Sequence, residues 1–319
     1  MQPITRRTSA PRTPQGAADL DDFDAALIRA LQADGRASIH DLAILLEASR
    51  DFVAQRLRLL TQGGGLRVVA ALDPGFVGHH VLVHAKVEVD GPITPIAEEV
   101  VQLPDAVFVS MTSGPLPLVF ESRHGDSHEL LDVLDHVRRL PTVRRVLVST
   151  YVEVLKGFFV SHGQSDIVLD RIDYELIAVL QQDGRTSYRA LADTVHLSPS
   201  STRARVQRLI DAGVIRIAAI KSGGFSRNRL AIGVGITIDG SPEPIRRFIM
   251  ESPYIDFAVR SHGSFDFIVT LVSASSAHLL PVMDAIRGLP GVSALDSWTH
   301  YDIVKEDYAR TLGRVLVRE

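Results

Sequence analysis

Polar and basic side chains gather on one predicted helix in the second half of the chain. Ser198-Pro199 is a strong helix start, because serine caps the first turn and proline suits the position after it. The polar side and edges of this helix carry the candidate DNA contacts, which are Ser198, Ser200, Ser201, Arg203, Arg205, Gln207 and Arg208. Serine and arginine side chains contact DNA phosphates, and arginine also binds guanine edges. The helix is therefore predicted to bind double-stranded DNA.

The opposite side of this helix is apolar and should pack inward. The residues that share this side at helical spacing are Thr202, Val206, Leu209 and Ile210. Arg205 lies at an edge of the polar side and Arg208 points outward, and an alternative role is open to both. They could form ion pairs with acids such as Asp173 and Asp211 instead of contacting DNA.

Histidines in the first half of the chain raise the question of a metal site. His128, Asp132 and His136 are four residues apart on a predicted helix, with His124 just before it. Residues at this spacing share one helix face. A solvated helix face explains the same pattern, and the second half of the chain has no equivalent, so we expect no metal.

The sequence gives little support for catalysis, cofactor binding or disulfide chemistry. The 319 residues contain no cysteine, which excludes disulfides and thiolate metal sites. No Ser/His/Asp arrangement, phosphate-binding glycine loop or paired-carboxylate motif is present, so we expect neither catalysis nor a cofactor. No apolar run approaches the roughly 18 residues of a membrane span. A net charge of −4 allows a local basic face, and we expect a cytoplasmic protein without a membrane partner.

The chain contains an internal repeat with a constant offset of 149 residues. Asp34-Gly35-Arg36 recurs as Asp183-Gly184-Arg185, Ser49 recurs as Ser198, and Lys156 recurs as Lys305. No gap is needed along the repeat. Chance cannot hold one register over such a length, so the chain is a duplication.

The sequences of the two copies predict the same order of secondary-structure elements, and the pattern is clearest in the second copy. Three short helices, with a tight turn before the third at 199–211, form a helix-turn-helix pattern. The order βαββαβ follows, which is the ferredoxin-like arrangement, with another α+β sandwich as the alternative. The predicted strands are 214–220, 230–238, 254–261, 265–272 and 292–304, and the predicted helices between them are 242–251 and 277–289.

These residues resemble the leucine-responsive/asparagine regulator (Lrp/AsnC) family of prokaryotic transcription factors. The resemblance rests on residues 169–215 of the second copy and on residues 20–38 and 71–78 of the first. It implies an α+β fold with two winged-type, three-helix helix-turn-helix domains alternating with two ferredoxin-like βαββαβ (RAM) domains. It also implies a sequence-specific transcription regulator. In this family, the RAM domains pair subunits and bind amino acids or related metabolites.

The DNA-binding helix of the first copy is predicted to be weaker. Arg56 and Arg58 are its candidate DNA contacts. Asp51 stands where the second copy has a serine, and phosphate repels an acid there. Leu59 stands where the second copy has an arginine. We expect this helix to bind DNA more weakly or to read a different half-site.

A loop of the second RAM domain is the candidate effector site. In the family, small ligands lie near a loop marked by a glycine and, three residues later, an aspartate. The residues here are Ser261, His262, Gly263, Ser264 and Asp266. The resemblance implies that the aspartate accepts from an amino group, whereas the alternative is that it caps a turn. The first copy has Gly114-Pro115-Leu116-Pro117 instead, so the ligand is expected at the second copy.

The predicted domain organisation follows the repeat. Its boundaries are a disordered N-terminal arm 1–18, a first helix-turn-helix 19–65, a first RAM-like domain 66–160, a linker 161–167, a second helix-turn-helix 168–214 and a second RAM-like domain 215–319. One fused chain could hold the paired RAM sheets of a dimer internally. The expected partners are DNA, a small-molecule effector and further copies of the chain, as a homodimer or homotetramer.

Two alternative functions are compatible with the same domain organisation. Sirohaem decarboxylases share the two-domain arrangement and are sometimes fused in pairs. Their helix-turn-helix has a phenylalanine- and proline-rich turn, where this chain has Asp-Gly-Arg twice, and their histidine-asparagine-tyrosine element is not found here. The other alternative is a corepressor that uses its RAM domains without binding DNA. The intact DNA-binding helix of the second copy argues against this alternative.

Overall fold

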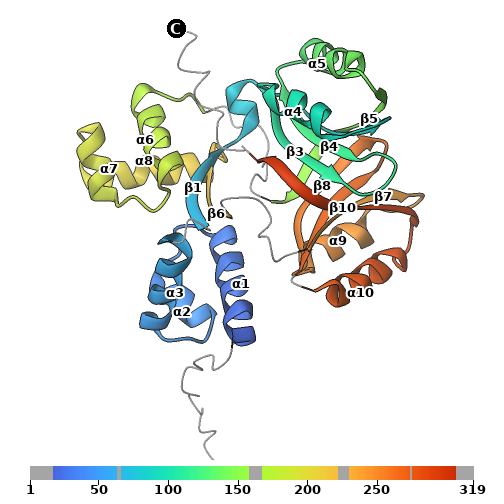
Figure 1. The fold of residues 1–319 in the computed structure, drawn as a ribbon. Helices are drawn as coiled ribbons and strands as arrows, with labels where there is room; N and C mark the ends of the chain where they lie inside the picture. The colour runs from blue at the N-terminus through green and yellow to red at the C-terminus, as the bar shows by residue number, and fades with distance from the viewer. Residues whose placement is uncertain (1–16, 63–65, 158–166, 222–229, 274, 307–319) are drawn as a thin grey trace, which may run out of the picture.

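The structure, a computed structural model, describes residues 17–62, 66–157, 167–221, 230–273 and 275–306 (Figure 1). Nearly all of the predicted N-terminal arm 1–18 and linker 161–167 lies outside these ranges. The described residues form two three-helix heads on one side and a closed barrel on the other.

Each head is built as the sequence predicts. The first contains α1 (Ala17–Ala33), α2 (Ile39–Leu45) and α3 (Arg50–Gln62), and the second contains α6 (Arg171–Gln182), α7 (Tyr188–Val195) and α8 (Pro199–Asp211). Ser187 and Ser198 cap α7 and α8, because their hydroxyls accept from the backbone amides of Ala190 and Ser201. Local signals thus fix where these helices begin.

A two-stranded ribbon joins the heads. β1 (Leu66–Leu72) pairs antiparallel with β6 (Ile215–Lys221) over seven residue pairs. The predicted boundaries assigned residues 66–72 and 215–221 to the RAM-like domains, whereas these strands pair with each other and not with the barrel. The ribbon is therefore a wing to which each copy gives one strand.

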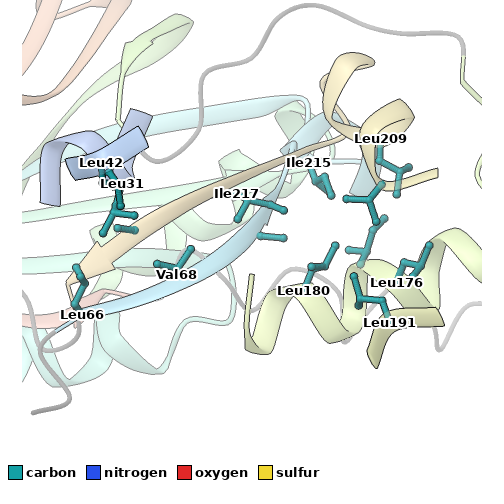
Figure 2. Packing of buried hydrophobic residues seen from close by; sticks show 14 of the residues in the cluster. Leu31, Leu42, Leu66, Val68, Leu176, Leu180, Leu191, Leu209, Ile215 and Ile217 are labelled. Atoms are coloured by element: carbon teal, nitrogen blue, oxygen red, sulfur yellow. The ribbon is translucent and has the colours of Figure 1, made fainter. Parts of the chain in front are cut away.

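The two heads share one hydrophobic core around this ribbon (Figure 2). Leu31 and Leu42 of the first head and Leu176 and Leu180 of the second are buried in the same cluster. Six of the seven β1 residues are buried, so the strand does not alternate between core and solvent. Helices of both heads cover the ribbon, and this explains the nearly continuous apolar sequence.

The barrel consists of two ferredoxin-like units, each with the predicted βαββαβ order. The first unit comprises β2 (Val81–Val89), α4 (Thr94–Gln102), β3 (Ala106–Thr112), β4 (Leu118–His124), α5 (Ser127–Arg139) and β5 (Val143–Lys156). The second comprises β7 (Leu230–Ile238), α9 (Glu243–Glu251), β8 (Ile255–Gly263), β9 (Phe267–Ser273), α10 (Ser276–Arg287) and β10 (Val292–Glu306). A short 3-10 turn (Pro74–Val77) lies between β1 and β2.

Two long strands close the barrel. The strand order is β10-β3-β4-β2-β5-β8-β9-β7, with β7 paired back to β10. β5 pairs with β2 in its first half and with β8 in its second half, and β10 does the same with β7 and β3. Bulges in the second halves let these strands bend from one sheet into the other. The expected pairing of the two RAM sheets within one chain is thus present.

Two lysines at equivalent positions of the repeat form hydrogen bonds across the two seams of the barrel, where strands of one copy pair with strands of the other. Lys156 at the end of β5 donates to the carbonyl of Ser252, which follows α9, at 2.7 Å. Lys305 at the end of β10 donates to the carbonyls of Val101 and Leu103 at the end of α4. Each copy thus sends a cation to the C-terminal end of the other copy's helix, where the helix dipole favours positive charge.

Candidate nucleic-acid interface

The start of α8 presents a row of hydroxyl groups. The Ser198 hydroxyl lies 2.9 Å from those of both Ser200 and Ser201, and all three residues are exposed. The first backbone amides of a helix have no intrahelical partner, and the helix dipole is positive there. Together, the hydroxyls and amides form a surface suited to a phosphate group.

The inward and outward sides of α8 are those that the sequence predicts. Thr202, Val206 and Leu209 have no exposed surface. Arg203 and Ala204 are exposed, and the Arg203 guanidinium lies 5.8 Å from the centre of the Tyr188 ring of α7. Arg203 is thus a basic side chain on the open face, beside the serines.

Arg205 and Arg208 instead bind a buried carboxylate. Asp173 of α6 has no exposed surface, and its two oxygens lie 3.0 Å from Arg205 Nη1 and 2.5 Å from Arg208 Nη2. Arg205 also lies 2.8 Å from Asp170, whose side chain caps α6. These hydrogen bonds, first the one that Arg205 donates to Asp170, raise the pKa of Arg205 above its ordinary value. The ion-pair alternative therefore describes both arginines, although about half of the Arg208 side chain stays exposed.

Gln207 also differs from its predicted role. Its side-chain amide donates to Asp211 at 2.7 Å, on the same exposed helix surface. Among the predicted DNA contacts of α8, the three serines, Arg203 and the exposed part of Arg208 stay open to a ligand.

The first head repeats the ion pair, here only partly buried, but not the polar surface. Arg56 binds Asp24 with two hydrogen bonds, of 2.9 and 2.5 Å, as Arg205 binds Asp173. Arg58 and Asp51 are exposed, and Leu59 is 51% exposed. Arg56 is therefore a structural residue, and Arg58 is the cation left on the outer side of α3 among those predicted to contact DNA.

Replacing Asp51 by serine is expected to strengthen DNA binding by the full chain up to about fivefold at low salt, because it removes one exposed charge that repels phosphate. The measurement is a fluorescence-anisotropy titration with an operator fragment. Asp132→Ser on α5 makes the same charge change away from the heads and should have no effect. Equal affinities for Asp51→Ser and the parent would show that the first head does not contact DNA through this helix.

The Asp-Gly-Arg triplets hold the two heads in a fixed relation. Arg36 of the first head donates to the carbonyls of Gly184 and Thr186 in the second, at 2.7 and 3.0 Å. Arg185 donates in the same way to Gly35 and Ala37, at 2.7 and 3.0 Å. Sequence reasoning used these triplets to find the repeat but did not predict this contact. Their constant 149-residue offset was the available signal, because equivalent residues can meet across a two-fold interface.

The predicted effector loop lies at a seam between the two barrel halves. Gly263 pairs with Ser149 of β5, and the backbone amide of Ser264 donates to the Ser149 hydroxyl at 3.2 Å. The Asp266 carboxylate accepts from the backbone amide of Ile238, at the end of β7, at 2.8 Å, so it binds a neighbouring strand and does not cap its own turn. Ser261 is buried and donates to the carbonyl of Phe265, whereas His262 is exposed.

The histidines of the first copy do not form a metal cluster. His124 is buried and shares a hydrogen bond of 2.8 Å with Ser122, whereas His128 and His136 are exposed on α5. Within the described ranges, no three histidine or acidic side chains come together in a way that could hold a metal ion.

Comparisons with known proteins agree with this arrangement. Residues 20–61 match the AsnC-type helix-turn-helix domain, and residues 169–216 match the winged helix-turn-helix DNA-binding domain. HTH-type transcriptional regulator FL11 of Pyrococcus horikoshii is 29% identical over 126 residues, which are 39% of this chain and 83% of that protein. The chain is similar to regulators of the Lrp/AsnC family. Its heads are helix-turn-helix DNA-binding domains.

The tandem form of the chain is visible in the share of each protein that aligns. An uncharacterized HTH-type transcriptional regulator of Pyrococcus abyssi is 28% identical over 155 residues, which are 47% of this chain but 97% of that protein. Such a relative has the size of one copy. In the part of the chain that the structure describes, no helix is long and apolar enough to cross a membrane.

A solved structure shares the architecture of almost the whole chain. The sirohaem decarboxylase NirDL, solved with an iron-uroporphyrin III analogue, superimposes with a TM-score of 0.58 over 93% of this chain and 97% of that chain. Its sequence identity is 14%, so the likeness concerns the fold.

Proposed function

We propose that this protein is a sequence-specific transcription regulator whose operator binding responds to a small-molecule effector. The observation that carries the proposal is the exposed row of Ser198, Ser200, Ser201 and Arg203 at the start of α8. The ribbon and the reciprocal arginines hold this helix in a fixed position relative to the equivalent helix of the first head. Fixed spacing between two such helices suits paired half-sites on one duplex.

Binding to the DNA upstream of the protein's own gene tests this proposal, by gel shift with competitor DNA. The double variant Ser200→Ala/Arg203→Ala is expected to lower the affinity by at least about tenfold and to reduce the salt dependence by about one counterion. Arg208→Ala is a poor choice because it removes a partner of the buried Asp173. Ser127→Ala/Arg139→Ala, at exposed positions of α5, is the matched control.

Unchanged binding by the Ser200→Ala/Arg203→Ala variant would move recognition to the first head or to the N-terminal residues. Absence of specific binding by the parent protein, with and without candidate amino acids, would overturn the proposal.

The effector is part of the proposal. Its site was predicted at Ser261, His262, Gly263, Ser264 and Asp266, and the position of this loop on a seam between barrel halves supports a role in transmitting a signal. An effector there would change the fit between the halves and so the DNA affinity of the heads. Assembly into homodimers or homotetramers is also proposed, and light scattering measures it.

A sirohaem-decarboxylase-like enzyme is the second candidate, because the architecture resembles NirDL along almost the whole chain. Adding iron uroporphyrin to the purified protein distinguishes the two. A shifted visible absorption band together with release of carbon dioxide from a tetrapyrrole would favour the enzyme. Specific DNA binding without either change would favour the regulator.

A further inference from the structure

A cavity of about 410 Å³ lies at the end of the barrel that faces the heads. The interior of the barrel contributes His84, Phe108 and Trp298, and the heads and ribbon contribute Arg29 and Arg216. Its volume falls in the range of about 300–1,000 Å³ that is typical of small-molecule sites. It is separate from the loop at Gly263, which does not line it.

The inner wall of this cavity is aromatic. Phe108, Tyr151, Phe257 and Trp298 line it, together with aliphatic side chains such as Val154 and Ile268. Trp298 is 2% exposed, and its indole Nε1 has no hydrogen-bond acceptor within the described residues. Buried donors normally have an acceptor. The aromatic side chains of this wall therefore suit a flat ring.

The charges around the cavity favour a single negative charge on the ligand. The cations that line it are Arg29, Arg123, Lys156 and Arg216. Three carboxylates oppose them, those of Glu121, Asp256 and Glu306. Burial, and then the nearby Lys86, lowers the pKa of His84 to about 3 and that of His300 to about 4, so both are neutral near pH 7. One positive charge is left, which suits a monoanion better than a polyanion.

We propose that this cavity binds a small aromatic monocarboxylate. The ring lies among the aromatic side chains and the carboxylate faces the cations at the mouth. Binding itself does not depend on the regulator function, whereas its effect on DNA affinity rests on that proposed function.

Contacts at the mouth explain how such a ligand would act on the heads. Arg216 of β6 donates to the carbonyl of Gly157 after β5 at 2.8 Å and to that of Gln32 of α1 at 2.9 Å. Gln32 and Gly157 both line the cavity. A carboxylate beside Arg216 competes with these carbonyls, and the bond to Gly157 joins the ribbon between the heads to the barrel. Occupancy therefore alters how the heads are held.

The binding test uses benzoate as the probe and the intrinsic fluorescence of Trp298, the single tryptophan of the chain, as the signal. Benzoate is expected to change this fluorescence saturably, with a Kd of about 1 mM or tighter. Benzyl alcohol, which keeps the ring without the charge, and acetate, which keeps the charge without the ring, should bind at least about tenfold more weakly. Isothermal titration calorimetry with the full chain gives an independent Kd.

Two pairs of variants locate the site. Ala33 is exposed at the mouth, so Ala33→Phe should block entry and weaken benzoate binding at least about tenfold without disturbing the core. Ala277→Phe, exposed on α10, is its control. Arg29→Gln should weaken benzoate binding up to about fivefold and leave benzyl alcohol unaffected. Arg139→Gln, on α5, removes the same charge elsewhere and should change neither.

The outcomes separate this inference from the proposed function. Absence of saturable benzoate binding, or equal binding by Ala33→Phe and the parent, would overturn the aromatic-acid site even if DNA binding is specific. Benzoate binding that is lost in Ala33→Phe would establish the site even if no operator is found. Specific DNA binding whose affinity changes with benzoate in the parent, but not in Ala33→Phe, would establish the coupling to the heads.

Discussion

Replacing both arginines around Asp173, in the variant Arg205→Ala/Arg208→Ala, is expected to destabilise the protein by about 3–5 kcal/mol. Asp173 would remain fully buried with its charge unpaired, and removing the partners of a buried charge costs about this much. The free energy of unfolding is measured by urea denaturation followed by circular dichroism. The second head is expected to melt first.

Charge neutralisation provides the control for this prediction. Adding Asp173→Asn to the double variant should recover part of the loss, because the buried group is then neutral. A loss below about 1 kcal/mol would show that the second head does not depend on the pairing of Asp173 with these arginines.

Gly35→Ala is expected to cost about 1–3 kcal/mol, the usual range for overpacking a filled core. An added Cβ would lie 2.7 Å from the carbonyl oxygen of Ile217 and 2.8 Å from a methyl carbon of Val68. Both contacts are with the ribbon, and the Gly35 amide already donates to that Ile217 carbonyl at 2.9 Å. The head can make room only by moving away from the ribbon, and this would also break the contacts of Arg36 and Arg185.

The readout for Gly35→Ala combines the thermal midpoint with limited proteolysis of the heads. Gly288→Ala is the matched control, because Gly288 has a right-handed helical backbone and its nearest neighbour to an added Cβ is 3.5 Å away. That control should change stability by less than about 0.5 kcal/mol. If Gly35→Ala behaves like the control, the heads do not need the close approach to the ribbon.

Local structure was predictable because its signals lie within a few residues. Ser187, Ser198 and Pro199 mark helix starts, and helical spacing shows that Val206 and Leu209 are buried. Strand pairing carries no such signal. The sequence predicts β6 as a strand but does not show that it pairs with β1, because the two strands lie about one repeat apart. Each apolar strand would suit a sheet of the following domain equally well.

The candidate DNA contacts were predictable as a face but not as individual roles. Helical periodicity places Arg205 at an edge of the polar side and Arg208 on its outward face, and from both positions a long side chain can reach either DNA or a neighbouring helix. The buried carboxylate of Asp173 decides the direction, and its burial depends on how α6 packs on α8. The cavity was not predictable at all, because its walls come from both barrel halves, α1 and β6, and form only when the barrel closes.

Closure of the barrel within one chain has a consequence for behaviour on dilution. A barrel assembled from two separate chains dissociates when the protein concentration drops below the dissociation constant of the dimer. Here both seams join parts of one covalent chain, so the partner half is present at a constant effective concentration. The paired unit should therefore persist at very few molecules per cell, and its melting temperature should not depend on protein concentration unless further copies associate.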